Sequence, residues 1–584
     1  MSTVIKPSQL LASINLPPQE LTRLSFCGSA KASVVREWVD NLQATKVMKT
    51  SGILYSAVPE LPRLKTDYNN RFEILENLRP TIQYAILGLQ KNFLNQPLIM
   101  PEDAQKAVVV AQSLQKNMVD GYLATIIQIA EKGKASKTTF DLLSKAIHRA
   151  ITGIGLLFFR NYQIYAQPPA GLWTTLNILY QVADYYGIAE TQVVDPSLYK
   201  LRSLSINGAY TRILMLASAK SNQMSQADIE SAYNAFENWC SAVTIAHELS
   251  DDPENFFAVN LSSSQGPIYK SKIQNRDQGR YIELEFKPLL SLLSKQSVNA
   301  EDIVNTGNTV KVPKDFPEPL LRHILDTWSN VAQRKFDRRV IESTAEVCVG
   351  LSDCHYFACN GQDFDYFLRS SGTQETQKIS RFTQGLTPAS HLNDYQNSCI
   401  PVHRVLIQNV SAGGYCILWN EDISSKVSAG EIMGVKEMGK RTWSVGVIRW
   451  VRQLKNASQL GIQLLANNAK PYGIAQTYDM GGYSEYMRAL FLPPTKFGQG
   501  NPTVLTASAP FQEFDKVKIV DGERESTAKL DRMVFSTKSV QQFRFRRLDS
   551  SSTETAQQTD ATAHDSQDTA QNNDEPDGFD SSWD

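Results

Sequence analysis

The chain has 584 residues, of which 42% are hydrophobic and 20% are charged, and its formal net charge at pH 7 is −1. This length predicts several domains, and this composition is typical of globular proteins rather than of fibrous ones. A charge so close to zero excludes a global field that would recruit nucleic acid or an anionic membrane surface.

The sequence does not predict membrane insertion or export. The longest apolar run covers residues 154–159, far short of the roughly 20 apolar residues that span a bilayer. Residues 1–11 lack the charged-then-apolar pattern of a signal peptide. The seven cysteines form an odd number in a long chain of this kind, which is typical of reduced thiols. We therefore expect a cytoplasmic protein with no transmembrane segment.

A large all-α domain is predicted for residues 13–250, after a flexible N-terminus at residues 1–12. Apolar residues recur at three- and four-residue steps over 102–131 and 139–159, and a last long helix is expected over 226–249. This domain offers much surface and no recognisable chemistry. We therefore expect it to bind a protein partner that the sequence does not identify.

The composition changes after residue 250, and residues 251–330 are predicted to form a mixed β/α connector. Alternating apolar residues predict short strands at 256–261 and 281–286. A helix expected over 320–332 leads the chain into the next domain.

Many short strands punctuated by glycine follow in residues 331–475 and predict a closed β-barrel. Strands are expected at 346–350, 355–358, 404–410, 415–419, 431–436, 443–451 and 461–466. Trp443 and Trp450 are expected in the barrel core. Residues 369–397 are polar and weakly patterned, so we interpret them as an insertion between strands.

A small β domain is predicted for residues 476–548, with strands at 489–492, 517–520, 533–536 and 542–546. Its last strand carries three basic residues beside two aromatic ones, namely Arg544, Arg546, Arg547, Phe543 and Phe545. Such a cluster either binds nucleic acid or forms the exposed face of a strand. Isolated basic clusters are weak evidence for binding, so we favour the exposed face and expect no nucleic-acid partner.

The remaining residues, 549–584, contain ten acidic residues and no lysine or arginine. A segment of this composition cannot bury a core, which predicts a disordered acidic tail. Residues 578–584 place Phe579 and Trp583 among acidic residues, a pattern typical either of a short docking peptide or of a solubilising tail. The predicted fold class is multidomain α+β: a large N-terminal all-α domain, a β-barrel, a small C-terminal β domain and a disordered tail.

The predicted barrel is preceded by an R-x-x-x-R motif, formed by Arg334 and Arg338 and followed by Arg339. A guanidinium group is a planar fork that holds phosphate or the edge of guanine with two hydrogen bonds. It also stacks on a purine face through cation–π attraction. The motif therefore suits a ligand that carries phosphate and guanine groups.

A second motif, N-x-S-x-x-G, follows the strand predicted at 404–410. Asn409 and Ser411 offer short donors and acceptors that can reach a guanine edge. Gly413 and Gly414 allow the backbone to turn sharply or to approach a ligand closely. Taken alone, each motif also fits an ordinary solvated helix end or hairpin turn.

In this order, the two motifs resemble the signature of the PilZ domain, a small β-barrel that binds cyclic di-GMP in bacteria. The resemblance covers about residues 331–474. It implies a PilZ-like β-barrel that binds cyclic di-GMP, with no other cofactor. Because the arginine motif lies between the helical domain and the barrel, we expect this binding to be coupled to the helical domain. The ligand-binding residues that it implies are Arg334, Arg338, Arg339, Asn409, Ser411, Gly413 and Gly414. Arg449 and Arg452 are candidate additional contacts.

Two features depart from the PilZ pattern. The motifs are 71 residues apart (409 minus 338), a longer gap than in compact members of the family. The cost of closing a loop grows only logarithmically with its length, so the barrel can accommodate this gap. The second motif begins with Asn409 where aspartate is common, and asparagine keeps the acceptor but loses the charge.

Other function classes are less well supported by the sequence. It contains no Walker loop, no nucleophile elbow, and neither the GGDEF nor the EAL string of cyclic di-GMP enzymes. We therefore expect a non-enzymatic receptor with no catalytic residues. Five cysteines and two histidines in the barrel region are possible zinc ligands: Cys348, Cys354, Cys359, Cys399, Cys416, His355 and His403. The cysteines lack the paired C-x-x-C spacing of zinc sites, so we expect no metal site. The alternative is a scaffold protein whose barrel no longer binds nucleotide.

Overall fold

The computed structural model describes most of the chain, as two compact units. The described residues are 5–43, 45–132, 136–276, 279–298, 310–330, 337–371, 400–420, 423–424, 426–454, 457–478, 481–494 and 501–548. The first unit comprises Met1–Val331 with Glu421–Ser425 and Arg452–Ser458, and the second unit comprises the other residues.

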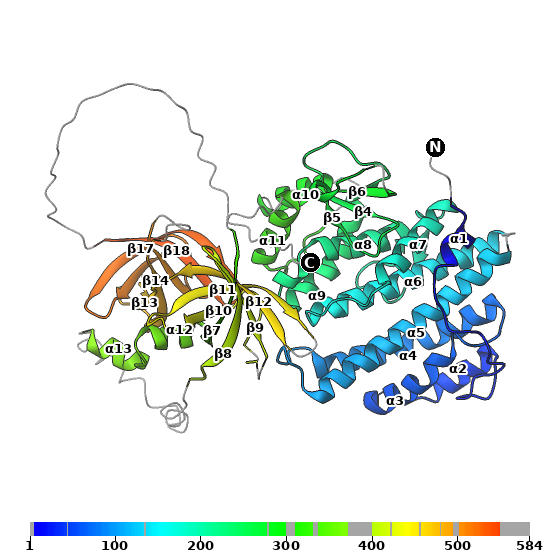
Figure 1. Cartoon of the computed structure of the whole chain (residues 1–584), viewed down its shortest axis with the longest axis horizontal. Helices are drawn as coiled ribbons and strands as arrows, with labels where there is room; N and C mark the ends of the chain where they lie inside the picture. Colours follow the sequence, from blue (N-terminus) through cyan, green and yellow to red (C-terminus); the bar gives the residue numbers. More distant parts are fainter. Residues whose placement is uncertain are drawn as a thin grey trace. The chain divides into compact units, whose positions relative to one another are not determined.

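The first unit consists mainly of helices, blue to green in Figure 1. They are α1 (Pro7–Leu11), α2 (Ala32–Asp40), α3 (Val47–Ala57), α4 (Tyr68–Phe93), α5 (Glu102–Lys132), α6 (Lys137–Gln163), α7 (Leu172–Tyr185), α8 (Ile206–Ser218), α9 (Gln226–Trp239), α10 (Lys287–Val298) and α11 (Glu318–Ser329). The long helices α4, α5 and α6 pack side by side. Helix α4 begins where the Asp67 carboxylate accepts hydrogen bonds from the backbone of Asn69 and Asn70, an N-cap that satisfies its first donors.

Helix α6 is long and apolar enough to cross a membrane, judged by its length and composition alone. In this structure, 78% of its most apolar window is buried inside the unit. A core helix that is apolar on all sides meets the same criterion. Among the described residues α6 is the one helix that meets it, which is weak evidence for a membrane span.

A buried carboxylate fixes the loop after α7 to the helix bundle. Asp195 is 1% exposed and accepts hydrogen bonds of 2.8 Å from both terminal nitrogens of Arg79 on α4. Arg149 on α6 lies 3.2 Å from the same carboxylate. Desolvation raises the pKa of Asp195, but the hydrogen bonds from Arg79 and the positive charges of Arg79 and Arg149 outweigh it and lower the pKa. The carboxylate therefore stays ionised in the core.

Short strands complete the first unit; those predicted at 256–261 and 281–286 are present, and the others were not predicted from the sequence. The strands are β1 (Gln192–Val194), β2 (Ser203–Ser205), β3 (Thr244–Ala246), β4 (Phe257–Asn260), β5 (Ile268–Tyr269) and β6 (Tyr281–Glu285), with β3, β6, β4 and β5 forming one sheet. The predicted helix at 226–249 ends at Trp239, because Thr244, Ile245 and Ala246 pair with β6 instead. The pair of β1 and β2 also interrupts the region predicted as all-α.

Both ends of this unit are more ordered than the sequence analysis expected. Residues 7–11, predicted as flexible, form α1, because Leu11 is 2% exposed and buries its side chain in the unit. At the other end, α11 from the predicted connector packs through Trp328, whose ring stacks 4.4 Å from that of Phe286. Its indole N–H donates to the Ser218 hydroxyl on α8. The connector elements therefore lie in the first unit.

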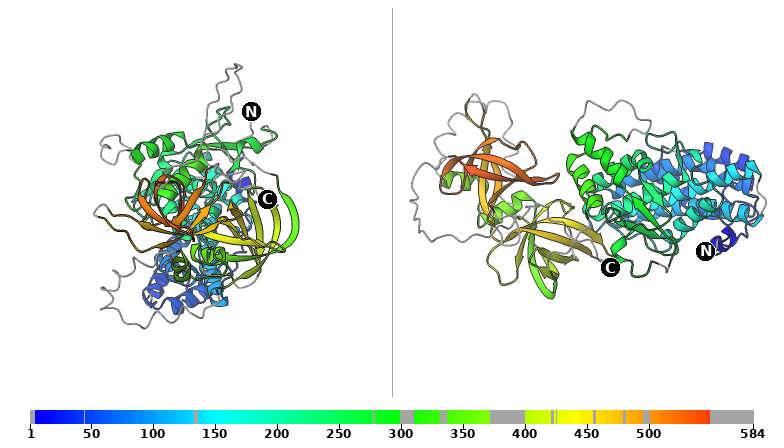
Figure 2. Two further views of the ribbon diagram at one scale, coloured as in Figure 1. Left: turned by 90° about the vertical axis from the view of Figure 1, so that its left-hand side faces the viewer. Right: turned by 90° about the horizontal axis from the view of Figure 1, so that it is seen from above.

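The second unit begins with a closed six-stranded barrel, green to yellow in Figures 1 and 2. Its strands are β7 (Arg339–Val349), β8 (His403–Ser411), β9 (Gly414–Trp419), β10 (Ile432–Glu437), β11 (Ser444–Gln453) and β12 (Ser458–Ala466), in the order β10-β11-β12-β9-β8-β7. Pairing of β7 with β10 closes the barrel. Trp450 is 1% exposed, as expected for the core, and Trp443 is half-buried and stacks on Phe357.

A second closed barrel follows, orange to red in Figure 2. Its strands are β13 (Lys470–Gln476), β14 (Met487–Leu492), β15 (Thr503–Ala507), β16 (Lys516–Val520), β17 (Glu525–Ser536) and β18 (Val540–Arg547), in the order β13-β14-β15-β18-β17-β16. Strand β13 belongs to this barrel, although the sequence analysis extended the first barrel to residue 475. The reason is pairing: β13 is hydrogen-bonded to β14 and β16.

A helix joins the cores of the two barrels where the sequence analysis predicted a strand. Residues 355–358 lie in α12 (Leu351–Ala358), which is followed by α13 (Phe364–Ser370). Gly350 ends β7 with a positive φ of 100°, a conformation that glycine adopts without strain. After it, Leu351, Cys354 and Phe357 recur at helical spacing and pack on a core cluster that contains residues of both barrels.

The imidazole of His355 on α12 is buried against the second barrel, with 1% exposure. One ring nitrogen lies 3.2 Å from the carbonyl oxygen of Tyr472 on β13, and the other lies 3.4 Å from the thiol of Cys359. The Phe364 and Phe367 rings meet its edges. Burial lowers the pKa of His355 to about 4, so the neutral ring is the form that the fold accommodates.

The predicted fold class is confirmed for the described residues, by a helical N-terminal region followed by two β-barrels. The predicted tail at 549–584 and residues 372–397 of the predicted insertion lie outside the described residues.

We predict that the second unit loses stability as the pH falls below about 6.5. An unfolded histidine titrates near 6.5 and the folded pKa is about 4, so between these values the unfolded state binds a proton that the folded state does not. This stabilisation is complete above the unfolded pKa and declines by about 2 kcal/mol on going from pH 7 to pH 5. Hydrogen exchange of β13 amides, corrected for intrinsic rates, measures the change.

The variant His355→Gln keeps an N–H donor without titrating, and should remove most of that decline. The exposed His247→Gln is the matched control and should leave it unchanged. An equal decline in the His355→Gln variant and the parent would contradict the prediction.

Candidate ligand-binding surface

Antiparallel pairing of β7 with β8 brings the two predicted motifs together. Arg339 lies opposite Val410, and Val340 lies opposite Asn409. The arginine motif precedes β7 directly, while the second motif occupies the end of β8 and the start of β9. Residues that are far apart in the sequence therefore lie on adjacent strands of one barrel.

The three arginines of the first motif differ in what the structure describes. Arg334 lies outside the described residues. Arg338 is half-buried directly before β7, and Arg339, the first residue of that strand, is exposed. Arg338 lies close enough to the Cys416 thiol on β9 for its charge to oppose the pKa rise that burial causes there. The guanidinium of Arg338 is thus placed beside the strand that follows the second motif.

Asn409 and Ser411 of the second motif have different environments. Asn409 is 8% exposed and lies opposite Val340 on β7 and Cys416 on β9. The Ser411 hydroxyl accepts a hydrogen bond of 3.3 Å from the backbone N–H of Gly413. This local bond fixes the turn between β8 and β9, so Ser411 has a structural role besides the ligand role implied by the resemblance.

The glycines of the second motif lie against the neighbouring strand β12. The carbonyl of Gly413 accepts a hydrogen bond from the backbone N–H of Leu464 at 2.8 Å. A Cβ added to Gly414 would lie 1.9 Å from the carbonyl oxygen of Ile462, an impossible overlap. Gly414 is therefore required for the close approach of two backbones, a role that the sequence alone did not predict.

The sequence analysis missed a cluster of amide side chains beside the second motif. Gln459 donates a hydrogen bond of 2.6 Å to the side-chain oxygen of Gln408, and the Cys416 thiol lies 3.7 Å from the same oxygen. Burial raises the pKa of Cys416 to about 11, although Arg338, Gln459 and Asn409 oppose the rise. The thiol therefore remains protonated at neutral pH. Glutamines have no motif spacing here, so only the strand order reveals this cluster.

Of the two additional arginines proposed as contacts, Arg449 lies nearer to the second motif. Its Nε donates a hydrogen bond to the side-chain oxygen of Gln463 on β12, and the Cα of Gln463 would lie 3.1 Å from a Cβ added to Gly414. The guanidinium also covers the ring of Phe535 in the second barrel, 4.9 Å from its centroid. Arg452 lies three residues farther along β11.

The cysteines and the basic strand have structural explanations. Among the described residues, no group of three or more metal-ligating side chains is close enough to hold an ion; Cys399 is not described. The sulfurs of Cys348 and Cys354 lie 3.9 Å apart within the shared core. On β18, Arg547 binds Asp521 at 2.7 Å and Arg546 lies 3.5 Å from Asp531. These pairings fit the exposed strand face favoured by the sequence analysis.

Comparison with known proteins relates most of the chain to one receptor family. Family models match in order: "Cyclic-di-GMP receptor FimW, N-terminal domain" at residues 32–251, its "middle PilZ domain" at 256–398 and 380–471, and the "FimW C-terminal beta-barrel domain" at 472–548. The cyclic-di-GMP receptor FimW of Pseudomonas aeruginosa is 27% identical over 571 residues, which cover 91% of this chain and 93% of that protein. No solved structure matches the chain significantly.

We predict that Gly414→Ala destabilises the first barrel by about 3 kcal/mol, because the new methyl group must displace β9 from β12. Hydrogen exchange of the amides in 403–419 measures the loss. Gly439→Ala in the same barrel is the matched control: its φ is +85° but nothing lies within 4 Å of the added carbon, so only backbone strain of about 1 kcal/mol applies. Equal losses in the two variants would show that contact with β12 is not the cause.

Proposed function

Because the chain belongs to the family of PilZ-domain cyclic di-GMP receptors, which are binding proteins rather than enzymes, we propose that its first barrel binds cyclic di-GMP. The observation that carries the proposal is the pairing of β7 with β8, which sets Arg339 opposite Val410 and Val340 opposite Asn409. A single compact ligand can then contact both motifs.

The side chains on this surface match the chemistry of the ligand. Cyclic di-GMP presents two phosphates and two guanines. Arg334, Arg338 and Arg339 supply guanidinium groups for phosphate, for the guanine O6/N7 edge or for stacking on the base. Asn409 and Ser411 supply neutral donors and acceptors for a base edge. Gly413 and Gly414 hold the turn close to β12, which leaves the surface beside them free of side-chain bulk.

We propose further that nucleotide binding is coupled to the helical unit. The arginine motif follows α11, the last described helix of the first unit, while Asn409 and Ser411 belong to the barrel. A ligand that contacts both motifs restrains the segment through which the helical unit is attached. The helical unit then presents a surface to a protein partner in a manner that depends on the nucleotide. The free energy by which the ligand shifts this conformational equilibrium cannot exceed the difference between its binding free energies for the restrained and unrestrained states.

We predict that Arg334→Ala and Arg338→Ala each weaken cyclic di-GMP binding tenfold or more. Each substitution removes charge-assisted hydrogen bonds worth about 1.5–3 kcal/mol. Calorimetric titration measures the affinity. Arg441→Ala is the matched control, because Arg441 is exposed in the same barrel outside both motifs, and it should bind as the parent does. If the Arg334→Ala and Arg338→Ala variants fold and bind cyclic di-GMP with unchanged affinity, the assigned site is refuted. If the parent protein does not bind cyclic di-GMP, a scaffold function is favoured.

We predict for the coupling that cyclic di-GMP adds hydrogen-exchange protection to residues 320–339 and changes the exchange of the helical unit. A preference of about 100-fold for the restrained state, equivalent to about 2.7 kcal/mol, would move an evenly divided population almost completely to one side. The comparison is the same chain with and without nucleotide. Protection confined to the barrel, with no change in the helical unit, would refute the coupling but not the receptor function.

A further inference from the structure

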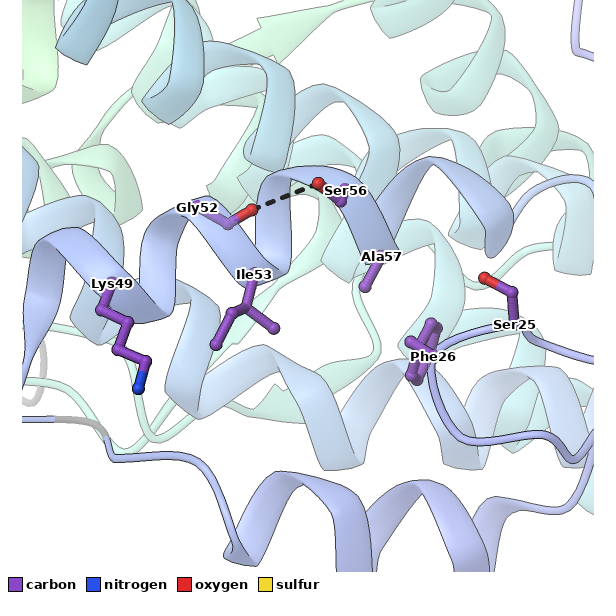
Figure 3. A pocket seen from close by; sticks show the side chains of 7 residues that line it. All are labelled: Ser25, Phe26, Lys49, Gly52, Ile53, Ser56 and Ala57. Carbon is purple, nitrogen blue, oxygen red and sulfur yellow. Dashed lines mark hydrogen bonds between the residues drawn. The ribbon is translucent and has the colours of Figure 1, made fainter.

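Helix α3 in the first unit exposes apolar side chains beside an open pocket. Met48, Ile53 and Tyr55 are 67%, 38% and 41% exposed. The pocket has a volume of about 500 Å³ and lies between α3 and the segment that precedes α2. Its lining residues are Ser25, Phe26, Lys49, Gly52, Ile53, Ser56 and Ala57 (Figure 3). This surface is remote in sequence from both nucleotide motifs.

The glycine in this pocket differs from the other helical glycines of the described chain. Gly88, Gly121, Gly153, Gly155 and Gly208 each have a neighbouring side-chain atom within 3.0 Å of where a Cβ would be, so close packing explains each of them. Gly52 has nothing within 4 Å of that position. A glycine in a helix interior costs about 1 kcal/mol relative to alanine, and packing within this fold does not require it. Gly52 is exposed, so the open position leaves room for a group from outside this fold to approach the backbone of α3.

The walls of the pocket offer one aromatic surface and one positive charge. The Phe26 ring lies 4.4 Å from the Trp38 ring, and Figure 3 shows Lys49 and Ile53 extending from the same side of α3. Among the described residues, the carboxylate that binds a lining residue belongs to Glu60, which accepts hydrogen bonds from both the backbone N–H and the hydroxyl of Ser25. An occupant should therefore combine an aromatic ring with negative charge.

One segment of the chain has this composition. Residues 45–57 contain Lys46 and Lys49 but no acidic residue, whereas residues 549–584 contain ten acidic residues and no lysine or arginine. Within residues 578–584, Phe579 and Trp583 lie beside two aspartates, Asp580 and Asp584. Residues 549–584 comprise 36 residues, and a chain of that length can span at most about 120 Å when fully extended.

We propose that the pocket on α3 is the docking site for the acidic aromatic segment at residues 578–584. An aromatic ring of the segment packs on Phe26 and Ile53 over the open face of Gly52. Aspartate carboxylates of the segment pair with Lys49. The helical unit thus carries a peptide-binding site that its own chain occupies until another acidic aromatic peptide displaces it.

The test is binding of a fluorescent, C-terminally amidated peptide of residues 572–584 to the full chain carrying Phe579→Ala and Trp583→Ala, which disable the chain's own segment. We expect saturable binding, measured by fluorescence anisotropy, and none with a peptide in which serine replaces both aromatic residues. Adding Gly52→Leu should weaken binding tenfold or more, because its side chain fills the pocket. Lys49→Glu should weaken it about fivefold, while Lys145→Glu, exposed on α6, should not.

Gly52→Ala separates docking from folding. Alanine favours the helix, so this variant should raise the Tm of the first unit by about 2 °C. It should also weaken binding of the peptide. Absence of binding to the parent, or equal binding to the parent and the Gly52→Leu variant, would overturn the proposal. If the peptide fails to bind but Gly52→Leu abolishes self-association in sedimentation, the occupant is a second copy of the chain, and the assigned segment is wrong.

Discussion

The pairing of β7 with β8 is the interaction on which the candidate ligand-binding surface depends. It aligns Val340 with Asn409 across a register shift between Val340 and Ser343. A one-residue slip of a strand moves all its side chains to the opposite face, so this register decides which residues of β7 share a face with Asn409. Val340 lies directly opposite Asn409 and shares its face, whereas Arg339 lies opposite Val410 and faces the other side of the sheet. The loop cost of their 71-residue separation grows only with the logarithm of its length. The barrel can therefore hold distant motifs together at small cost.

The closed barrel that fixes this register is itself supported by its neighbour. Cys348 and Cys354 pack in one cluster with Leu490 and Leu505 of the second barrel. Across the same region, the Ser539 hydroxyl donates a hydrogen bond of 2.7 Å to Glu431. A site built on strands whose outer face is also packed is more precise than one on free loops. The second barrel thus contributes to the site without supplying either motif.

Local patterns predicted part of this arrangement, and the remainder depended on pairing between distant residues. Alternation predicted β8 through β12 because each strand carries its own apolar period. The same criterion failed at residues 355–358, where the positive φ of Gly350 and helical spacing of Leu351 and Cys354 favour α12. The motif residues were found by type and spacing. Their glutamine neighbours Gln408 and Gln459 were not, since only the sheet order makes them adjacent.

Gly52 and Gly414 show how the surroundings of a residue, rather than its type, carry functional information. At Gly414 the space of the missing side chain is occupied by the backbone of β12, so the fold alone accounts for the glycine. At Gly52 that space is empty, although the helix would be more stable with alanine. Gly52 is exposed, so a contact from outside the fold can use this space, as the proposed docking site does. By this criterion Gly414 is explained by the fold itself, whereas Gly52 is available for binding a partner segment.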